Sequence, residues 1–244
     1  MPGTNWGCLF SNWSRTVAER VEVRQSVLKE NDRIAGELRE ALAARQILCL
    51  NLISSPGAGK TSILESTLDA LRGTSRRVAV LTGDIQTERD ADRLRRFGFP
   101  ALQITTGGTC HLDASMVRRA LEEMPLDGLD VLFIENVGNL VCPASYDLGE
   151  DAKVVVLSVA EGDDKPLKYP GIFRRARLML LHKIDLLPHT RFSRDAAVAD
   201  ARRVNPEIEV LETSCVAEPG LGAWLRWIEG RLEEKRQAGR PARV

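Results

Sequence analysis

A glycine-rich segment that ends in lysine and threonine carries the most specific chemistry in the sequence. Residues 54–61 read Ser-Ser-Pro-Gly-Ala-Gly-Lys-Thr, the GxxxxGK[ST] pattern of a phosphate-binding loop with serine in place of the first glycine. Gly57 and Gly59 let backbone N–H groups turn toward phosphate oxygens, and the start of the following helix adds positive potential. We expect Lys60 to contact the β and γ phosphates and Thr61 to bind Mg²⁺. The residues predicted to bind a nucleoside triphosphate here are Pro56, Gly57, Ala58, Gly59, Lys60, Thr61 and Ser62.

Two carboxylates and a glycine follow two other apolar segments of strand length. Asp84 comes after Val78–Thr82, and Glu135 comes after Val131–Ile134. Because ligands of parallel sheets bind at the carboxyl ends of the strands, we expect both side chains beside the phosphate-binding loop. One can hold a water ligand of Mg²⁺ while the other orients the attacking water, and the Gly138 N–H can contact a γ-phosphate. The alternative is that each acid only caps a helix. We assign Lys60, Asp84, Glu135 and Gly138 to hydrolysis, and Thr61, Asp84 and Glu135 to magnesium.

A third motif predicts which base the nucleotide carries. The apolar segment Leu178–Leu181 is followed by His-Lys-Ile-Asp, where G proteins have Asn-Lys-x-Asp. The carboxylate of Asp185 can accept from the ring N–H and the exocyclic amine of guanine, whereas adenine would leave it unpaired. The motif therefore favours GTP, although His182 in place of asparagine leaves the selectivity open. The expected base-binding residues are Lys183, Asp185, Ser214 and Cys215, the last two lying just after the segment Ile208–Leu211.

Two cysteines and a histidine could bind a softer metal ion. Cys110 and His111 are adjacent after a glycine pair, and Cys142 lies only four residues beyond Gly138. One imidazole and two thiolates suit Zn²⁺ or Ni²⁺ and suit Mg²⁺ poorly. The spacing alone does not decide between a metal site and a buried thiol beside a capping histidine. Cys49 is expected in the core.

Alternating strand-like and helix-like segments predict an α/β fold. The strands are expected at Ile47–Ile53, Val78–Thr82, Ala101–Ile104, Val131–Ile134, Val154–Val159, Leu178–Leu181 and Ile208–Leu211, and the helices at Ser62–Leu71, Glu88–Phe97, Asp113–Met124, Ser193–Val204 and Leu221–Glu234. Near-continuous apolar strands alternating with helices are typical of a mainly parallel sheet covered on both faces, a P-loop NTPase-like three-layer fold.

The chain divides into four parts on the same patterns. We expect a flexible arm over residues 1–14, an amphipathic helix over 15–45, a G domain with an embedded metal site over 46–234 and a basic tail over 235–244. The apolar stripe of the helix, which includes Leu28, Ala35 and Leu42, either packs on the main domain or forms a dimer seam.

Composition excludes several classes of protein. The 244 residues carry 34 Lys plus Arg and 34 Asp plus Glu, so the chain lacks the surplus of cations that binding to nucleic acid requires. No apolar run is long enough for a membrane span, and no signal peptide is apparent. Five scattered cysteines do not form a secreted disulfide framework, which favours a cytoplasmic protein.

Taken together, the motifs resemble the HypB family, the nickel-incorporation GTPases of [NiFe]-hydrogenase maturation. The resemblance extends over roughly residues 21–234, and its most specific stretch is Phe133–Pro143. The segments that carry it are Ser54–Thr61, Gly83–Thr87 with Asp90–Arg93, Cys110–Ala114, Phe133–Glu150 and Glu161–Pro170. Many relatives have a cysteine-rich or histidine-rich nickel motif near the N-terminus, whereas here only Cys8 precedes the expected helix.

The resemblance implies an activity and a set of partners. It implies a SIMIBI-class GTPase architecture and Mg²⁺-dependent GTP hydrolysis coupled to homodimerisation. It places a Ni²⁺ or Zn²⁺ site at Cys110, His111 and Cys142, near the dimer face. A HypA-type metallochaperone and a hydrogenase large-subunit precursor are the implied partners. The alternatives are a UreG-like urease nickel GTPase, a P-loop kinase acting on a small metabolite, and a regulatory G protein without metal.

Overall fold

A seven-stranded parallel sheet forms the centre of the computed structural model, which describes residues 7–84 and 89–238. The strand order is β3-β2-β4-β1-β5-β6-β7, and every neighbouring pair is parallel. The strands are β1 Leu48–Ser54, β2 Val78–Asp84, β3 Ala101–Thr105, β4 Val131–Glu135, β5 Ala152–Ser158, β6 Ala176–His182 and β7 Glu209–Thr213. All seven expected strands are present, and the prediction of a parallel α/β fold is confirmed.

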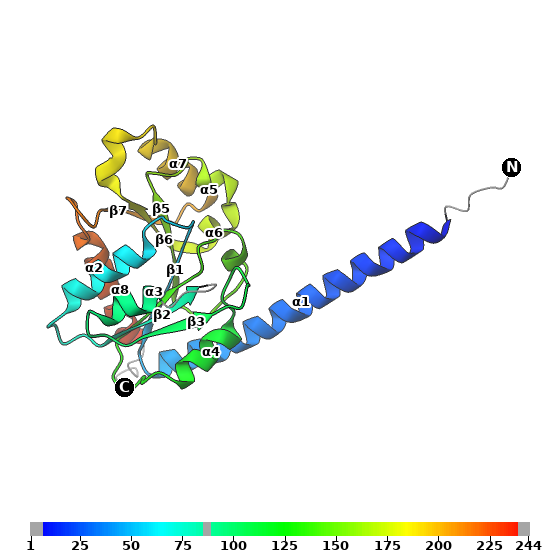
Figure 1. Cartoon of the computed structure of the whole chain (residues 1–244), viewed down its shortest axis with the longest axis horizontal. Coiled ribbons are helices and arrows are strands. Elements are labelled where there is room, and N and C mark those ends of the chain that lie inside the picture. Colours follow the sequence, from blue (N-terminus) through cyan, green and yellow to red (C-terminus); the bar gives the residue numbers. More distant parts are fainter. Residues whose placement is uncertain (1–6, 85–88, 239–244) are drawn as a thin grey trace.

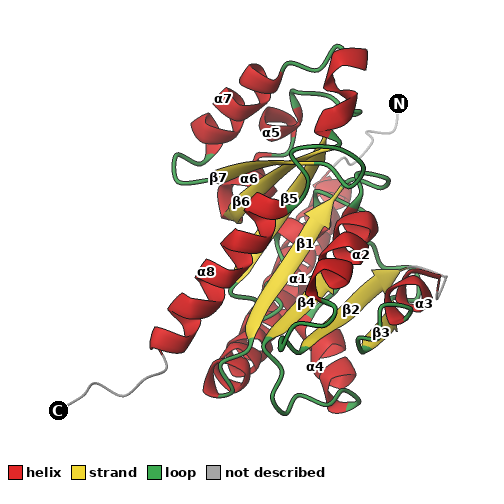
Figure 2. Cartoon of the chain, turned by 90° about the vertical axis from the view of Figure 1, so that its left-hand side faces the viewer, coloured by secondary structure: helices red, strands yellow, loops and turns green. Residues whose placement is uncertain are grey.

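Helices cover both faces of this sheet and make the three layers visible in Figure 2. One face packs against α2 Lys60–Leu71, α3 Arg89–Arg95 and α8 Gly222–Ala238. The other packs against α1 Gly7–Ala44, α4 Ala114–Glu122, α6 Pro170–Arg175 and α7 Arg194–Val204. The short helix α5 Lys165–Lys168 and the 3₁₀ turns Cys142–Ala144 and Ile184–His189, which the sequence patterns did not predict, lie in the connections.

Strand β1 shows why the strands read as continuous apolar runs. Leu48, Leu50 and Leu52 face the core layer beneath α2 and α8, whereas Cys49 and Ile53 face the layers on the opposite side. Both faces of the strand are therefore buried, as expected of a central parallel strand. Cys49 is fully buried, and burial raises the pKa of its thiol well above the usual value. It lies in the core as predicted.

The first helix begins earlier than the sequence pattern indicated. In place of a loose arm over 1–14, α1 is helical from Gly7 onward, so Cys8 lies within the helix and does not precede it. Residues 1–6 of the expected arm lie outside the described residues. Residues 7–14 lack the apolar periodicity of a packed helix. They also contain no proline, so nothing in this segment prevents a helix. The C-terminal part of α1 packs through Ala35, Leu38 and Leu42 onto the domain, while its N-terminal part extends away from the sheet (Figure 1).

The last helix also extends further than predicted, since α8 includes the first four residues of the expected basic tail, 235–238. Two cations of this segment pair with acids on the body of the domain. Lys235 Nζ lies 2.5 Å from Asp151 Oδ1, and Arg236 Nη2 lies 2.5 Å from Asp130 Oδ1. These pairs hold the last turn of the helix against the end of the sheet. Within the described ranges, no helix is both long and apolar enough to cross a membrane.

Candidate nucleotide and metal sites

The phosphate-binding loop connects the end of β1 to the start of α2, at the carboxyl edge of the sheet. Its two central glycines have positive φ angles, 73° at Gly57 and 111° at Gly59, which side chains disfavour. Lys60, the first residue of α2, is buried, and its ammonium donates to Ser54 Oγ at 2.9 Å. Burial lowers the pKa of Lys60, although the carboxylate of Glu135 opposes that effect. The lysine is thus held inside the loop, where a phosphate can take the place of its serine partner.

A cavity of about 450 Å³ opens above this loop. It is lined by ten of the residues that the sequence assigned to nucleotide, magnesium or hydrolysis: Pro56, Gly57, Gly59, Lys60, Thr61, Ser62, Asp84, Glu135, Gly138 and Lys183. Ala58 does not line the cavity, because it is buried behind the loop in the core. Asp90, Arg93 and Asn136 also line it, and the sequence patterns had not marked them as binding residues.

Glu135 is the acid most closely joined to the loop. Its Oε1 accepts a hydrogen bond from Thr61 Oγ1 at 2.7 Å, and its Oε2 is buried without a hydrogen-bond partner among the described residues. Burial raises the pKa of Glu135 to about 7, while the nearby Lys60 ammonium opposes the rise. A buried carboxylate with a spare oxygen beside a hydroxyl offers the hard oxygen ligands that Mg²⁺ prefers. Asp84 supplies a second carboxylate at the same cavity, so these residues fit a magnesium ion.

Gly138 lies directly against the phosphate-binding loop. A Cβ atom at Gly138 would lie 3.0 Å from the Cα and 3.1 Å from the N of Pro56. Glycine is therefore needed for the segment after β4 to approach the loop this closely. The contact of the Gly138 backbone N–H with a terminal phosphate stays a prediction.

The expected base-binding residues lie at the ends of β6 and β7. Asp185 Oδ1 accepts from Ser214 Oγ at 2.5 Å, and Lys183 Nζ donates to the carbonyl of Gly57 at 2.8 Å. The structure thus brings the two predicted base loops together, with Lys183 bridging them to the phosphate-binding loop. Cys215 is partly buried and packs on the core beneath α8. Asp185, Ser214 and Cys215 are not among the residues that line the 450 Å³ cavity.

His182 takes a structural position beneath the loop. The ring is buried, its Nδ1 lies 3.0 Å from Thr213 Oγ1, and a Cβ at Gly59 would lie 2.5 Å from its Cδ2. Burial, aided by the charge of Lys183, lowers the pKa of His182 to about 4, so the ring is neutral at pH 7. The side chain therefore packs against the backbone of the phosphate-binding loop at Gly59.

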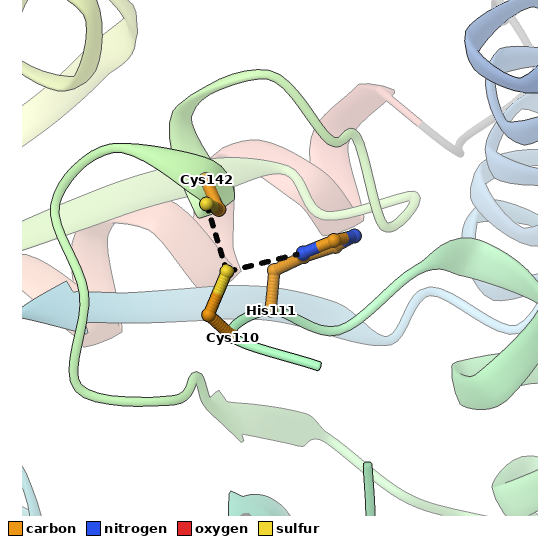
Figure 3. Close-up of side chains that lie close together, drawn as sticks. All are labelled: Cys110, His111 and Cys142. Atoms are coloured by element: carbon orange, nitrogen blue, oxygen red, sulfur yellow. Dashed lines mark hydrogen bonds between the residues drawn. The ribbon is translucent and has the colours of Figure 1, made fainter. Parts of the chain in front are cut away.

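Cys110, His111 and Cys142 converge on one point (Figure 3). Cys110 Sγ lies 2.8 Å from Cys142 Sγ and 3.8 Å from His111 Nδ1, and the three donor atoms lie within 4.8 Å of one another. Gly107 and Gly108, with φ angles of 61° and 99°, form the irregular turn that lets two adjacent side chains converge. The structure therefore brings together the three residues that sequence spacing alone could not join.

Two neighbouring side chains hold this cluster in place, and neither has a signal in the sequence pattern. Asn139 Nδ2 donates to the carbonyl of Cys110 at 3.3 Å, while its Oδ1 accepts from the Val141 N–H at 2.8 Å. Asn139 therefore joins the two cysteine-bearing loops. Tyr146 stacks on the His111 ring, with ring centroids 3.9 Å apart. Only the folded arrangement of three distant loops reveals these contacts.

The cluster has the donor set of a soft metal ion. Two thiolates on one tetrahedral ion lie about 3.8 Å apart, given metal–sulfur bonds of about 2.3 Å. The cysteine sulfurs would separate by about 1 Å to bind it, which a side-chain rotation achieves. Burial lowers the pKa of His111, which favours the neutral imidazole that coordinates metals. The hydrogen bond to Cys142 raises the pKa of Cys110, so metal binding has to displace a proton.

Fold and cavity together define a phosphate-loop nucleotide-binding protein with an adjoining cysteine–histidine cluster. Residues 48–212 match the nucleotide-binding domain described as CobW/HypB/UreG. The hydrogenase maturation factor HypB of Azotobacter chroococcum mcd 1 is 56% identical over 211 residues, covering 86% of this chain and 68% of that protein. HypB of Escherichia coli K12 is 54% identical over 209 residues, covering 86% and 72%. The chain belongs to the CobW/HypB/UreG family and, within it, to the HypB hydrogenase maturation factors.

Solved structures agree with this assignment. The crystal structure of Helicobacter pylori HypB in complex with nickel matches with a TM-score of 0.79 and 40% identity, covering 88% of this chain and 99% of that one. HypB from Archaeoglobus fulgidus matches with a TM-score of 0.78 and 38% identity, covering 84% and 99%. The signal recognition particle 54 kDa protein from Aeropyrum pernix, in complex with GDP, shares the fold at 16% identity, with a TM-score of 0.50 and coverage of 80% and 51%.

Proposed function

We propose that this chain is a cytoplasmic, GTP-hydrolysing metallochaperone that delivers nickel to a [NiFe]-hydrogenase precursor. One observation carries the proposal: the segment that leaves β4 contributes to both sites. Glu135 and Gly138 line the nucleotide cavity, and Cys142 completes the metal cluster. A change in the bound nucleotide that moves this segment would therefore change the geometry of the metal site.

The proposed roles in phosphate binding and hydrolysis are supported by the residues that line the cavity. Lys60 and the backbone of Gly57 and Gly59 would bind the phosphates. Mg²⁺, held by Thr61 with Asp84 or Glu135, would neutralise the charge that develops on the transferred phosphoryl group. The other carboxylate would orient the attacking water. Asp185, supported by Ser214, would select guanine.

Nickel is the cargo of this mechanism. Two thiolates and one imidazole leave a coordination position open, through which the ion can be taken up and passed on. Zn²⁺ fits the same donor set. The relatives named as hydrogenase maturation factors support a role in that process. As partners we propose a HypA-type metallochaperone and a hydrogenase large-subunit precursor, together with a nucleotide-dependent homodimer.

Hydrolysis of GTP and of ATP by the purified chain tests the enzymatic part. We expect Mg²⁺-dependent hydrolysis of labelled GTP. An excess of unlabelled GTP should suppress this hydrolysis, and an excess of ATP should not. Asp185→Asn should weaken GTP binding by about 10- to 100-fold, because a charged partner of the guanine N–H groups is lost. A P-loop kinase would use ATP and would be insensitive to this substitution. A G protein without metal would show the same GTP preference but would bind no Ni²⁺ at Cys110 and Cys142.

A further inference from the structure

One buried side chain lies between the nucleotide cavity and the metal cluster. Asn136 directly follows Glu135, is 2% exposed, and has its backbone N–H bound to the carbonyl of Leu52 in β1. Its Oδ1 accepts from the N–H of Val137 at 3.0 Å and from the N–H of Leu112 at 3.4 Å. Asn136 therefore contacts both the segment that carries Glu135 and the residue that follows His111.

Leu112 is fixed from a second direction by the other carboxylate-bearing strand. Its side chain is fully buried, and a Cβ at Gly83 would lie 2.8 to 2.9 Å from three of its carbons. Gly83 directly precedes Asp84. The residue next to the metal-binding histidine is thus in contact with both strand ends that carry the carboxylates of the nucleotide site.

The amide of Asn136 is also held on its far side by a buried polar chain. Its Nδ2 donates to Asn51 Oδ1 at 3.2 Å, and Asn51 Nδ2 donates to Glu150 Oε1 at 3.4 Å. Glu150 pairs with Lys153 at 2.8 Å and accepts from the Leu148 N–H at 2.7 Å. A buried chain whose members all have partners has a defined geometry. Asn136 therefore cannot turn freely when the segment after β4 moves, and a displacement of that segment is passed to its partners.

We infer that Asn136 is a positioning residue that transmits the nucleotide state to the metal site, through its hydrogen bond to the Leu112 backbone. The inference rests on the proposed function, because it requires that the chain bind both nucleotide and nickel. A γ-phosphate that displaces Val137 and Gly138 moves the Val137 N–H bound to Asn136 Oδ1, and the change reaches His111 through the Leu112 N–H that binds the same oxygen. Coupling of this kind is reciprocal, so nickel must change nucleotide affinity by the same factor.

The test is a titration of Ni²⁺ into the full chain, bound either to GDP or to a non-hydrolysable GTP analogue. The quantity measured is the ratio of the two nickel dissociation constants. We expect a ratio of at least about fivefold in the wild type, the lower end of typical couplings. Asn136→Ala should bring the ratio close to one when each nucleotide is kept at a saturating concentration, which is needed because Asn136 lines the nucleotide cavity.

Asn139→Ala is the matched control, since Asn139 holds the cysteine loops together and makes no contact with the nucleotide cavity. It should weaken nickel binding in both nucleotide states and leave the ratio unchanged. If Asn136→Ala does not fold, Asn136→Ser keeps a small polar group at the position and carries the same expectation. Thermal unfolding of each variant separates loss of structure from loss of coupling.

One result would overturn the inference while the proposed function stands: an unchanged ratio in Asn136→Ala or Asn136→Ser, with both ligands still bound. A ratio of one in the wild type, despite binding of both ligands, would overturn the inference together with the nucleotide control of nickel binding on which it rests. Failure of the wild type to bind either nickel or GTP would instead overturn the proposed function, on which the inference depends.

Discussion

Replacing Glu135 by glutamine should change how the stability of the nucleotide-free protein depends on pH. The carboxyl group is 5% exposed, and burial raises its pKa from an ordinary 4.5 to about 7. Between these two values the folded protein holds a proton that the unfolded chain has released. The resulting stabilisation is full below about pH 4.5 and is lost as the pH rises through 7.

The size of the effect follows from the same pair of values. A difference of about 2.5 pKa units corresponds to roughly 3 kcal/mol of unfolding free energy. Glutamine keeps an oxygen that accepts from Thr61 but carries no proton to release. Relative to Glu135→Gln, the wild type should therefore lose roughly 3 kcal/mol between pH 4.5 and 8.

Urea unfolding of both proteins, without nucleotide and with a metal chelator, measures this difference. Lys60 does not cancel in the comparison, because the Glu135 carboxylate raises its pKa against the effect of burial. Titrating groups that do not interact with Glu135 cancel. They include His182, whose pKa of about 4 has the opposite effect, since stability falls as the pH drops from 6.5 toward 4. Glu207→Gln, which removes an exposed carboxylate, serves as the control variant. A difference between wild type and Glu135→Gln that stays constant across the range would refute the reasoning.

Three substitutions test the contacts around the phosphate-binding loop. Gly138→Ala should lower the rate of GTP hydrolysis by about tenfold, because the new Cβ forces Pro56 to shift by a few tenths of an ångström; an unchanged steady-state rate would contradict this. Gly59→Ala should lower the unfolding free energy by about 1–3 kcal/mol, since φ is 111° and the His182 ring blocks the Cβ; thermal unfolding at an unchanged midpoint would contradict it. His182→Asn should leave the preference for GTP over ATP unchanged in competition binding, because the ring packs beneath the loop against Gly59, Thr213 and the Cys215 thiol; a clear gain in selectivity would place the ring at the base.

The phosphate site could be predicted from sequence because its chemistry is local. The glycines, Lys60 and Thr61 are consecutive, and β1 and α2 on either side are marked by strong apolar patterns. The carboxylates could be placed as well, since parallel strands end at the same edge of the sheet. The central strands could be predicted because each is a nearly continuous apolar run, whereas the edge strands β3 and β7 have shorter apolar segments interrupted by polar residues.

The metal cluster and its supports could not be derived in this way. Cys142 and Cys110 lie on two irregular loops. The course of such loops cannot be predicted from hydrophobic periodicity, so the contact between the two sulfurs could not be predicted either. Asn136, Asn139 and Tyr146 act through single contacts to residues distant in sequence. The start of α1 was missed because apolar periodicity marks only helices that pack against another element. The N-terminal part of α1 extends away from the domain (Figure 1).

The central claim is that one chain binds nickel at Cys110, His111 and Cys142 under the control of its nucleotide. Calorimetric titration of Ni²⁺ into the wild type and into Cys142→Ser, each with GDP and with a GTP analogue, tests it most directly. We predict one tight site per wild-type chain, with an affinity that differs at least about fivefold between the nucleotide states. The loss in Cys142→Ser should exceed about 100-fold, because a direct ligand matters more than its supporting contacts. Equal affinity in both nucleotide states, or unchanged binding by Cys142→Ser, would contradict the account.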